Sequence, residues 1–182
     1  MTGNEETEYA ESTKPKEGMT MFREMRRFRQ QLSEAETVEI LREGKTGVLG
    51  VLGDDGYPYT VPVNYVYEDG KIYFHGSKAG HKQDAIARCD KVSLCVVAQD
   101  DVVADDLTTY FRSVIVFGRA RVLETEEEIF HAAEAFGLKY NEDRERVDTE
   151  IRREWSALRC VEITIEHMTG KEAIELTRAR KK

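Results

Sequence analysis

The sequence predicts a mainly β protein in which about six strands form a small antiparallel barrel with helices at its periphery. Short apolar segments rich in Val and Tyr follow one another through residues 48–124. Asp-Gly pairs at 55–56 and 69–70 mark tight turns between them, and this dipeptide is a strong hairpin signal. Because the first strands are joined by hairpins instead of regular helices, a doubly wound parallel sheet is not expected.

Six strands are expected, over residues 48–52, 59–67, 71–75, 91–99, 110–124 and 160–166. Pro58 and Pro62 lack a backbone donor, so the second strand is expected at an edge or a bend of the sheet. Gly118 indicates a bulge or a bend in the fifth strand. We expect the acidic residues 100–109 to form a loop, and Thr169-Gly170 to form a turn after the last strand.

Four helices are expected, over residues 33–43, from about residue 80, over 126–140 and over 141–157. The first and third begin with capping boxes, formed by Ser33 with Glu36 and by Thr125 with Glu128. In a capping box the two side chains bond each other's backbone N–H groups at the start of a helix. These helices interrupt the strands at only a few points, as expected for helices at the periphery of a barrel.

The 182 residues fit one domain, and the sequence contains no internal repeat. Residues 1–20 are expected to form a flexible, polar tail, residues 21–175 the folded domain, and residues 176–182 a basic, solvated C-terminal tail. The polar N-terminal segment has no apolar core of the kind found in signal peptides. The chain is therefore expected to fold around one core.

Charge and cysteine content narrow the function. The formal net charge is −8 and the pI is about 5.2, whereas nucleic-acid-binding domains usually carry a basic face. No apolar run reaches the roughly 18 residues of a membrane span. The three cysteines form no Cys-x-x-Cys pair, which favours reduced thiols over a disulfide framework or a zinc site. We therefore expect a cytoplasmic protein without nucleic-acid or membrane partners.

The segment "YFHGSKAGHK" (Tyr73–Lys82) gathers small and cationic residues directly after a strand. His75 and His81 alone do not complete a metal-binding motif, so no metal site is predicted. The glycines permit close backbone approach, and a helix starting near Gly80 would direct free N–H groups at the turn. The segment therefore suits a phosphate, and the alternative is a solvated turn that carries cations.

The order of these segments resembles a known family. The run "GVLGVLGDDGYPYTVPVNYVYEDGKIYFHGSKAGHKQDAIARCDKVSLCVV", with its "GHK", and the later "FRSVIVFGRARVL" are similar to the core of the flavin-binding split β-barrel family related to pyridoxamine 5′-phosphate oxidase. Within that family the chain most closely resembles the nitroimidazole-resistance branch, and the resemblance runs from about residue 21 to about residue 171. It implies a six-stranded antiparallel split β-barrel that forms a homodimer, with FMN in a cleft between the two barrels.

The resemblance also implies which residues contact FMN. They are Val61, Pro62, Val63, Asn64 and Tyr65 along the isoalloxazine, Phe74, His75, Gly76 and Ser77 beside the flavin and ribityl chain, His81 and Lys82 at the phosphate, and Ser113 from the same or the other subunit. In the nitroimidazole branch a histidine at the His75 position lies near the flavin and the substrate. His75 is therefore the candidate catalytic residue.

The resemblance implies an FMN-dependent oxidoreductase that reduces a nitroimidazole, another nitroaromatic compound or an unidentified small molecule by flavin hydride transfer. The sequence contains no catalytic triad, which agrees with chemistry carried by a cofactor. Two alternatives stay open. One is a flavin-, deazaflavin- or haem-binding protein without turnover, such as a sensor or storage protein, for which His75, His81, His131 and His167 are the available haem ligands. The other is a pyridoxamine 5′-phosphate oxidase-type enzyme.

Overall fold

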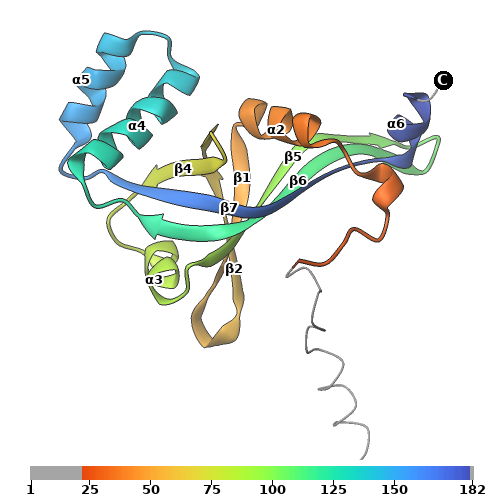
Figure 1. The fold of residues 1–182 in the computed structure, drawn as a ribbon, viewed down its shortest axis with the longest axis horizontal. Helices are drawn as coiled ribbons and strands as arrows, with labels where there is room; N and C mark the ends of the chain where they lie inside the picture. Colours follow the sequence, from red (N-terminus) through yellow and green to blue (C-terminus); the bar gives the residue numbers. More distant parts are fainter. Residues whose placement is uncertain (1–21, 181–182) are drawn as a thin grey trace, which may run out of the picture.

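The computed structural model describes residues 22–180, and the predicted tail at 1–20 lies outside the described residues. Its centre is one antiparallel sheet of seven strands in the order β2-β1-β5-β6-β7-β4-β3 (Figure 1). The strands are β1 (Thr46–Leu52), β2 (Pro58–Asn64), β3 (Val66–Glu68), β4 (Lys71–Gly76), β5 (Lys91–Val103), β6 (Thr108–Val122) and β7 (Arg159–Glu172). The prediction of a mainly β, antiparallel fold with helices is confirmed.

The predicted count of six strands is wrong, because the segment expected as one strand over 59–67 divides at Tyr65. β2 pairs with β1 and β3 pairs with β4, so the two halves of this segment lie at opposite ends of the strand order. The Tyr65 side chain is completely buried at the point of division. The sheet therefore curls round without closing, and β2 is an edge strand, as Pro58 and Pro62 predicted.

The strands β5 and β7 exceed their predicted lengths, and β6 begins and ends two residues earlier than predicted. Residues 100–103 pair with residues 108–111 instead of forming an acidic loop, and the charged side chains of Asp100 and Asp101 remain exposed to water. Gly170 is not in a turn but pairs with Val114 inside β7. A Cβ at Gly170 would lie 2.4 Å from Thr37 Oγ1, so this glycine permits close packing of a helix on the sheet. The predicted bulge at Gly118 is confirmed by a register shift between Phe117 and Gly118.

The helices are η1 (Phe28–Gln30), α2 (Glu34–Glu43), η2 (Asp54–Gly56), α3 (His81–Arg88), α4 (Glu126–Tyr140), α5 (Arg144–Glu154) and α6 (Ile174–Ala179). Both predicted capping boxes are present, at the starts of α2 and α4. None of the helices formed by residues 22–180 is long and apolar enough to cross a membrane.

Two apolar clusters form because side chains alternate along β4 and β7. Phe74 and Val161 pack inside the curled sheet. Tyr73 and Cys160 face the other way, toward the hairpin formed by α4 and α5. This hairpin covers the end of the sheet where β4 and the start of β7 lie side by side (Figure 1). Trp155, at the C-terminus of α5, packs against this second cluster.

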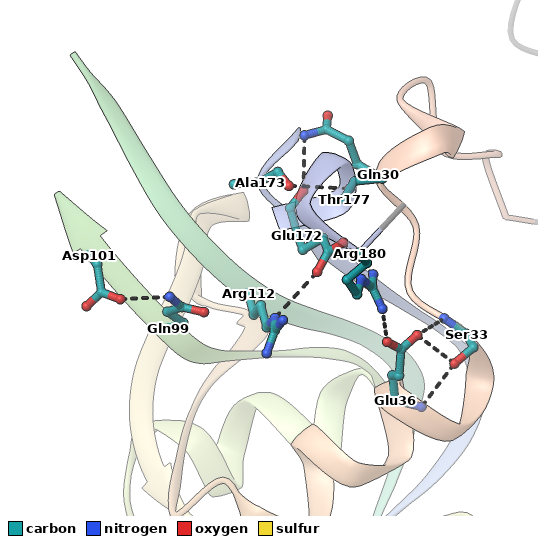
Figure 2. Close-up of polar contacts among 10 residues, drawn as sticks. All are labelled: Gln30, Ser33, Glu36, Gln99, Asp101, Arg112, Glu172, Ala173, Thr177 and Arg180. Carbon is teal, nitrogen blue, oxygen red and sulfur yellow. Dashed lines mark hydrogen bonds and ion pairs between the residues drawn. The ribbon is translucent and has the colours of Figure 1, made fainter. Parts of the chain in front are cut away.

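The expected solvated C-terminal tail is corrected for the residues that the structure describes. Residues 174–179 form α6, and Thr177 is buried. Figure 2 shows Arg180 between two carboxylates, Glu172 of β7 and Glu36 of α2. The positive charge of Arg180 therefore links the C-terminal segment to β7 and α2.

Candidate functional site

His75 lies near the end of β4, where alternation directs its side chain toward the α4–α5 hairpin. It pairs in register with Cys160 of β7. Its ring meets the ring of Phe136 edge to face, with 4.5 Å between the centroids. The preceding Phe74 is 1% exposed and packs in the barrel core. Of these two predicted contacts, His75 therefore offers its side chain to a ligand and Phe74 only its main chain.

Burial lowers the pKa of His75 below its usual value of 6.5, and the nearby ammonium of Lys82 lowers it further. Both effects disfavour the imidazolium, the first because charge is costly outside water and the second because like charges repel. His75 is therefore a neutral imidazole at neutral pH. One ring nitrogen can donate a hydrogen bond and the other can accept one or bind a metal ion.

The turn from β4 to α3 has the features of an anion cradle. A Cβ at Gly76 would lie 2.9 Å from Lys82 Nζ, so the missing side chain leaves the ammonium directly over the backbone. Gly80 precedes α3 with a φ of 132°, a conformation that favours glycine. The backbone N–H groups of Gly80, His81 and Lys82 have no acceptor within residues 22–180. Free N–H groups at a helix start, with an adjacent cation, suit a phosphate.

The imidazole of His81 is directed away from this cradle. It stacks on Tyr59 of β2 with 4.0 Å between ring centroids, and its Nε2 lies 3.5 Å from Asp54 Oδ2. Asp54 also pairs with Arg88 at 2.7 Å. These contacts leave the main-chain N–H of His81 for the turn. The sequence analysis did not place Tyr59 beside this turn, because cross-strand aromatics are common in β-sheets.

The predicted contacts on β2 are mostly engaged in the fold. Val63 is buried in the core, and Val61 packs against it. The side-chain amide of Asn64 donates to the Lys45 carbonyl at 3.0 Å and to Thr46 Oγ1 at 3.1 Å. Because β2 has a hydrogen-bonded neighbour on one side only, its second backbone edge is open beside the exposed Pro62. This edge can therefore offer main-chain groups to a planar ligand.

Tyr65 is enclosed by the end of α4. Lys139 Nζ donates to the Tyr65 carbonyl at 3.0 Å and lies 4.5 Å from the centre of the Tyr65 ring. The Tyr140 hydroxyl donates to the same carbonyl at 3.3 Å. Burial lowers the pKa of Lys139 to about 8. The Tyr65 side chain is therefore a structural element of the barrel, and α4 fixes the corner between β2 and β3.

A cavity of about 840 Å³ separates the end of β4 from the helical hairpin. Its β4 side is formed by His75, Gly76 and Ser77. The helices contribute Ala133, Phe136, Gly137, Asn141, Arg146, Val147, Glu150, Ile151, Arg153 and Glu154, followed by Ala157 and Leu158. None of these helical residues is predicted as a site residue from the sequence. Helical periodicity gives the apolar face of each helix but not the strand on which it packs.

Ser113 does not join the other predicted contacts within one chain. It pairs with Lys171 of β7, whereas His75 pairs with Cys160, eleven residues earlier on the same strand (171 − 160). Eleven residues of strand span about 35 Å. Ser113 lies instead on the outward face of the sheet, between Val97 and Lys171.

An open, curled antiparallel sheet with a glycine-rich turn after β4 defines a split-barrel protein. The chain belongs to the pyridoxamine 5′-phosphate oxidase family, whose model matches residues 33–172. Proteins of this family bind flavins. A search of curated proteins finds no match.

Solved structures share the fold. A candidate 5-nitroimidazole antibiotic resistance protein from Bacteroides thetaiotaomicron is 21% identical, with a TM-score of 0.65 over 78% of this chain and 86% of that chain. The flavocytochrome Anf3 from Azotobacter vinelandii is 22% identical, with a TM-score of 0.69 over 82% and 72%. An FAD- and haem-binding protein from Mycobacterium smegmatis is 18% identical, with a TM-score of 0.62 over 79% and 73%. At these identities the similarity establishes the fold alone.

Proposed function

We propose that this protein is an FMN-dependent oxidoreductase that reduces nitroaromatic compounds. The observation that carries the proposal is the position of Lys82 over the bare backbone of Gly76, beside the neutral imidazole of His75. The ammonium of Lys82 suits a dianionic phosphate, and the imidazole of His75 suits a reacting small molecule. The similarity to a candidate nitroimidazole resistance protein supports the choice of substrate class.

The residues of the cradle fit the phosphate end of FMN. Lys82, the Ser77 hydroxyl and the free N–H groups at the start of α3 would hold the phosphate, and the open edge of β2 would provide main-chain groups for the ring. Bound FMN would supply hydride transfer, so the chain itself needs no nucleophile or catalytic metal. The protein's part is to hold the cofactor and orient the compound to be reduced.

His75 would act on the compound to be reduced. A neutral imidazole carries one N–H group, which can donate a hydrogen bond to an oxygen of the nitro group, and one nitrogen that can accept a hydrogen bond. The edge-to-face contact with Phe136 covers one side of the ring and leaves the rest open to a ligand. We propose that His75 donates a hydrogen bond to the substrate.

We further propose a homodimer built on the outward face of the sheet around Ser113. Neighbouring strands there place Val48 beside Cys95, Cys95 beside Ile115, and Val97 beside Ser113. Val48 and Val97 are 42% and 58% exposed, and a continuous apolar patch on an exposed sheet face is typical of an interface. In such a dimer Ser113 would approach the partner's cofactor site.

The visible absorption spectrum of the purified protein tests the function. Flavin bands that bleach with a reductant and return on addition of a nitroimidazole are expected. A protein that stays colourless and does not take up added FMN would refute the proposal, and a bound flavin that no nitro compound reoxidises would refute the substrate class.

A second candidate function is haem binding with His75 as axial ligand. It is favoured by the cavity of about 840 Å³ beside His75, whose depressed pKa leaves a ring nitrogen free to bind iron. Of the solved structures with the same fold, one is a flavocytochrome and another is an FAD- and haem-binding protein. Addition of haemin should then produce a Soret band that disappears in His75→Ala, and a band that is unchanged in this variant would exclude His75 as the ligand.

A further inference from the structure

The cavity between β4 and the α4–α5 hairpin has an uneven charge distribution. Four charged residues line it: Arg146, Glu150, Arg153 and Glu154. Arg153 forms ion pairs with both Glu150 and Glu154, so one guanidinium is shared between two carboxylates. Arg146 forms no ion pair with any residue in the range 22–180. The four charges balance, but Arg146 is the one cation of this lining without an ion-pair partner among the residues that the structure describes.

The groups around Arg146 also suit an anion. Arg146 lies in the first turn of α5, which Asp143 caps through its bond to the Arg146 N–H. The Asn141 side-chain oxygen accepts from the Asp143 N–H at 3.0 Å. The amide NH₂ of Asn141 donates to no other group within residues 22–180 and lines the same cavity. A guanidinium and an amide donor together match the two oxygens of a carboxylate.

The remaining walls are apolar and partly aromatic. Phe136 and His75 supply rings, and Val147, Ile151 and Leu158 supply aliphatic surface. Aromatic edges and faces bind planar rings in offset or edge-to-face geometry. A ligand for this cavity therefore needs a flat apolar body as well as an anionic group.

We infer that this cavity binds a planar ring that carries a carboxylate, with Arg146 as the residue that selects the acid. This inference deepens the proposed function and rests on it in one respect: the ring at His75 would be the compound that is reduced, which narrows the substrate class to nitroaromatic acids. The same chemistry is present in the propionates of a porphyrin, so the experiment has two arms.

The first arm compares 4-nitrobenzoate with 4-nitrobenzamide, which has a similar shape and no charge. Calorimetric titration of the purified protein is expected to give about tenfold tighter binding of the acid than of the amide. A hydrogen bond to a charged group contributes roughly the binding free energy that corresponds to a tenfold change in affinity. Arg146→Met should abolish the preference. The matched control is Arg152→Met, which removes a cation from the same helix but one that lies over Phe130 and does not line this cavity.

In the second arm, haemin is titrated into the wild-type protein, Arg146→Met and Arg152→Met, and the Soret band is measured. Dependence on Arg146 for 4-nitrobenzoate assigns the cavity to small acids, and dependence for haemin assigns it to a porphyrin. Equal binding of the acid and the amide, with haemin binding unchanged in Arg146→Met, overturns the inference. Calorimetry needs no flavin, so a protein that prefers the acid but binds no FMN would refute the proposed function and leave this inference standing.

Discussion

At the scale of single residues, the site depends on where two rings and one ammonium are held. The His75 ring meets the Phe136 ring edge to face, and Lys82 lies close to both His75 and the backbone of Gly76. The sequence predicted the Gly76–Lys82 cradle because its small and cationic residues are adjacent in the chain. It did not predict Phe136 or Arg146, since their approach to β4 is a property of tertiary packing.

The pKa of His75 provides a test of this arrangement. The folded protein should protonate His75 below pH 6.5, whereas the unfolded chain protonates it near that value. The His75 contribution to the free energy of unfolding should therefore decrease as the pH falls below about 6.5. In an NMR titration Phe136→Ala should raise this pKa by admitting water, and Lys82→Met should raise it less, because burial is the larger cause. An unchanged pKa in both variants would contradict the arrangement.

Lys82 also determines cofactor retention under the proposed function. Lys82→Met is expected to weaken FMN binding by about 1–3 kcal/mol, the value of a charge-assisted hydrogen bond. The control is Lys78→Met, which removes an exposed cation of the same turn. Fluorescence titration with FMN measures both. Equal losses in the two variants would remove Lys82 from the phosphate site.

At the scale of elements, the α4–α5 hairpin forms one wall of the cavity, and the two helices touch at a glycine. The structure of this hairpin could be predicted only in part. The capping box and the apolar spacing located α4, but nothing in the sequence showed that Gly137 and Val147 would meet. The split between β2 and β3 was missed for a similar reason, because a residue at which a strand changes partners retains the alternation of a continuous strand.

Gly137→Ala should destabilise the protein. Its Cβ would lie 2.5 Å from Val147 Cγ1, and overpacking of this kind costs about 1–3 kcal/mol, more than the gain of up to about 1 kcal/mol from better helix propensity. Urea unfolding measures the change. In a Val147→Ala background the clash is absent, so the same substitution should become neutral or stabilising. Destabilisation of equal size in both backgrounds would show that the helices do not touch here.

At the scale of the whole molecule, a charge cluster around the buried Glu172 joins segments that are far apart in sequence (Figure 2). Glu172 is fully buried and lies 3.4 Å from Arg112, while Arg180 bridges it to Glu36. The Glu172 carbonyl also accepts from Gln30 Nε2 at 3.0 Å. η1, α2, β6 and the end of α6 therefore meet around Glu172, whose carboxylate contacts Arg112 and Arg180 and whose backbone carbonyl contacts Gln30. This cluster could not be predicted from the sequence, because a charged C-terminal segment is more often solvated.

Glu172→Ala should lower the free energy of unfolding by about 2–4 kcal/mol, because it leaves the charge of Arg112 near a buried site without its partner. Glu39→Ala, an exposed carboxylate of α2, is the control and should change stability by less than about 0.5 kcal/mol. Thermal and urea unfolding measure both. Similar effects of the two substitutions would show that the cluster contributes no more than a surface charge.

The proposed dimer can be tested on the same scale. Val97→Glu places a charge in the centre of the outward sheet face and is expected to shift the protein to a monomer in sedimentation velocity. Val102→Glu is the matched control. Val102 is 76% exposed and lies near the end of β5, five residues further along the strand than Val97 (102 − 97). A dimer that persists in Val97→Glu would assign the interface to another surface.

The strand order has a consequence for how the chain reaches this structure. β7 lies between β6 and β4, yet it is made last of the seven strands. Until the ribosome releases it, β4 and β6 each present an unpaired strand edge, and such edges promote association between nascent chains. The glycine-rich turn at the end of β4 therefore cannot be completed during synthesis, and a chain that stops before residue 159 should aggregate rather than bind a ligand.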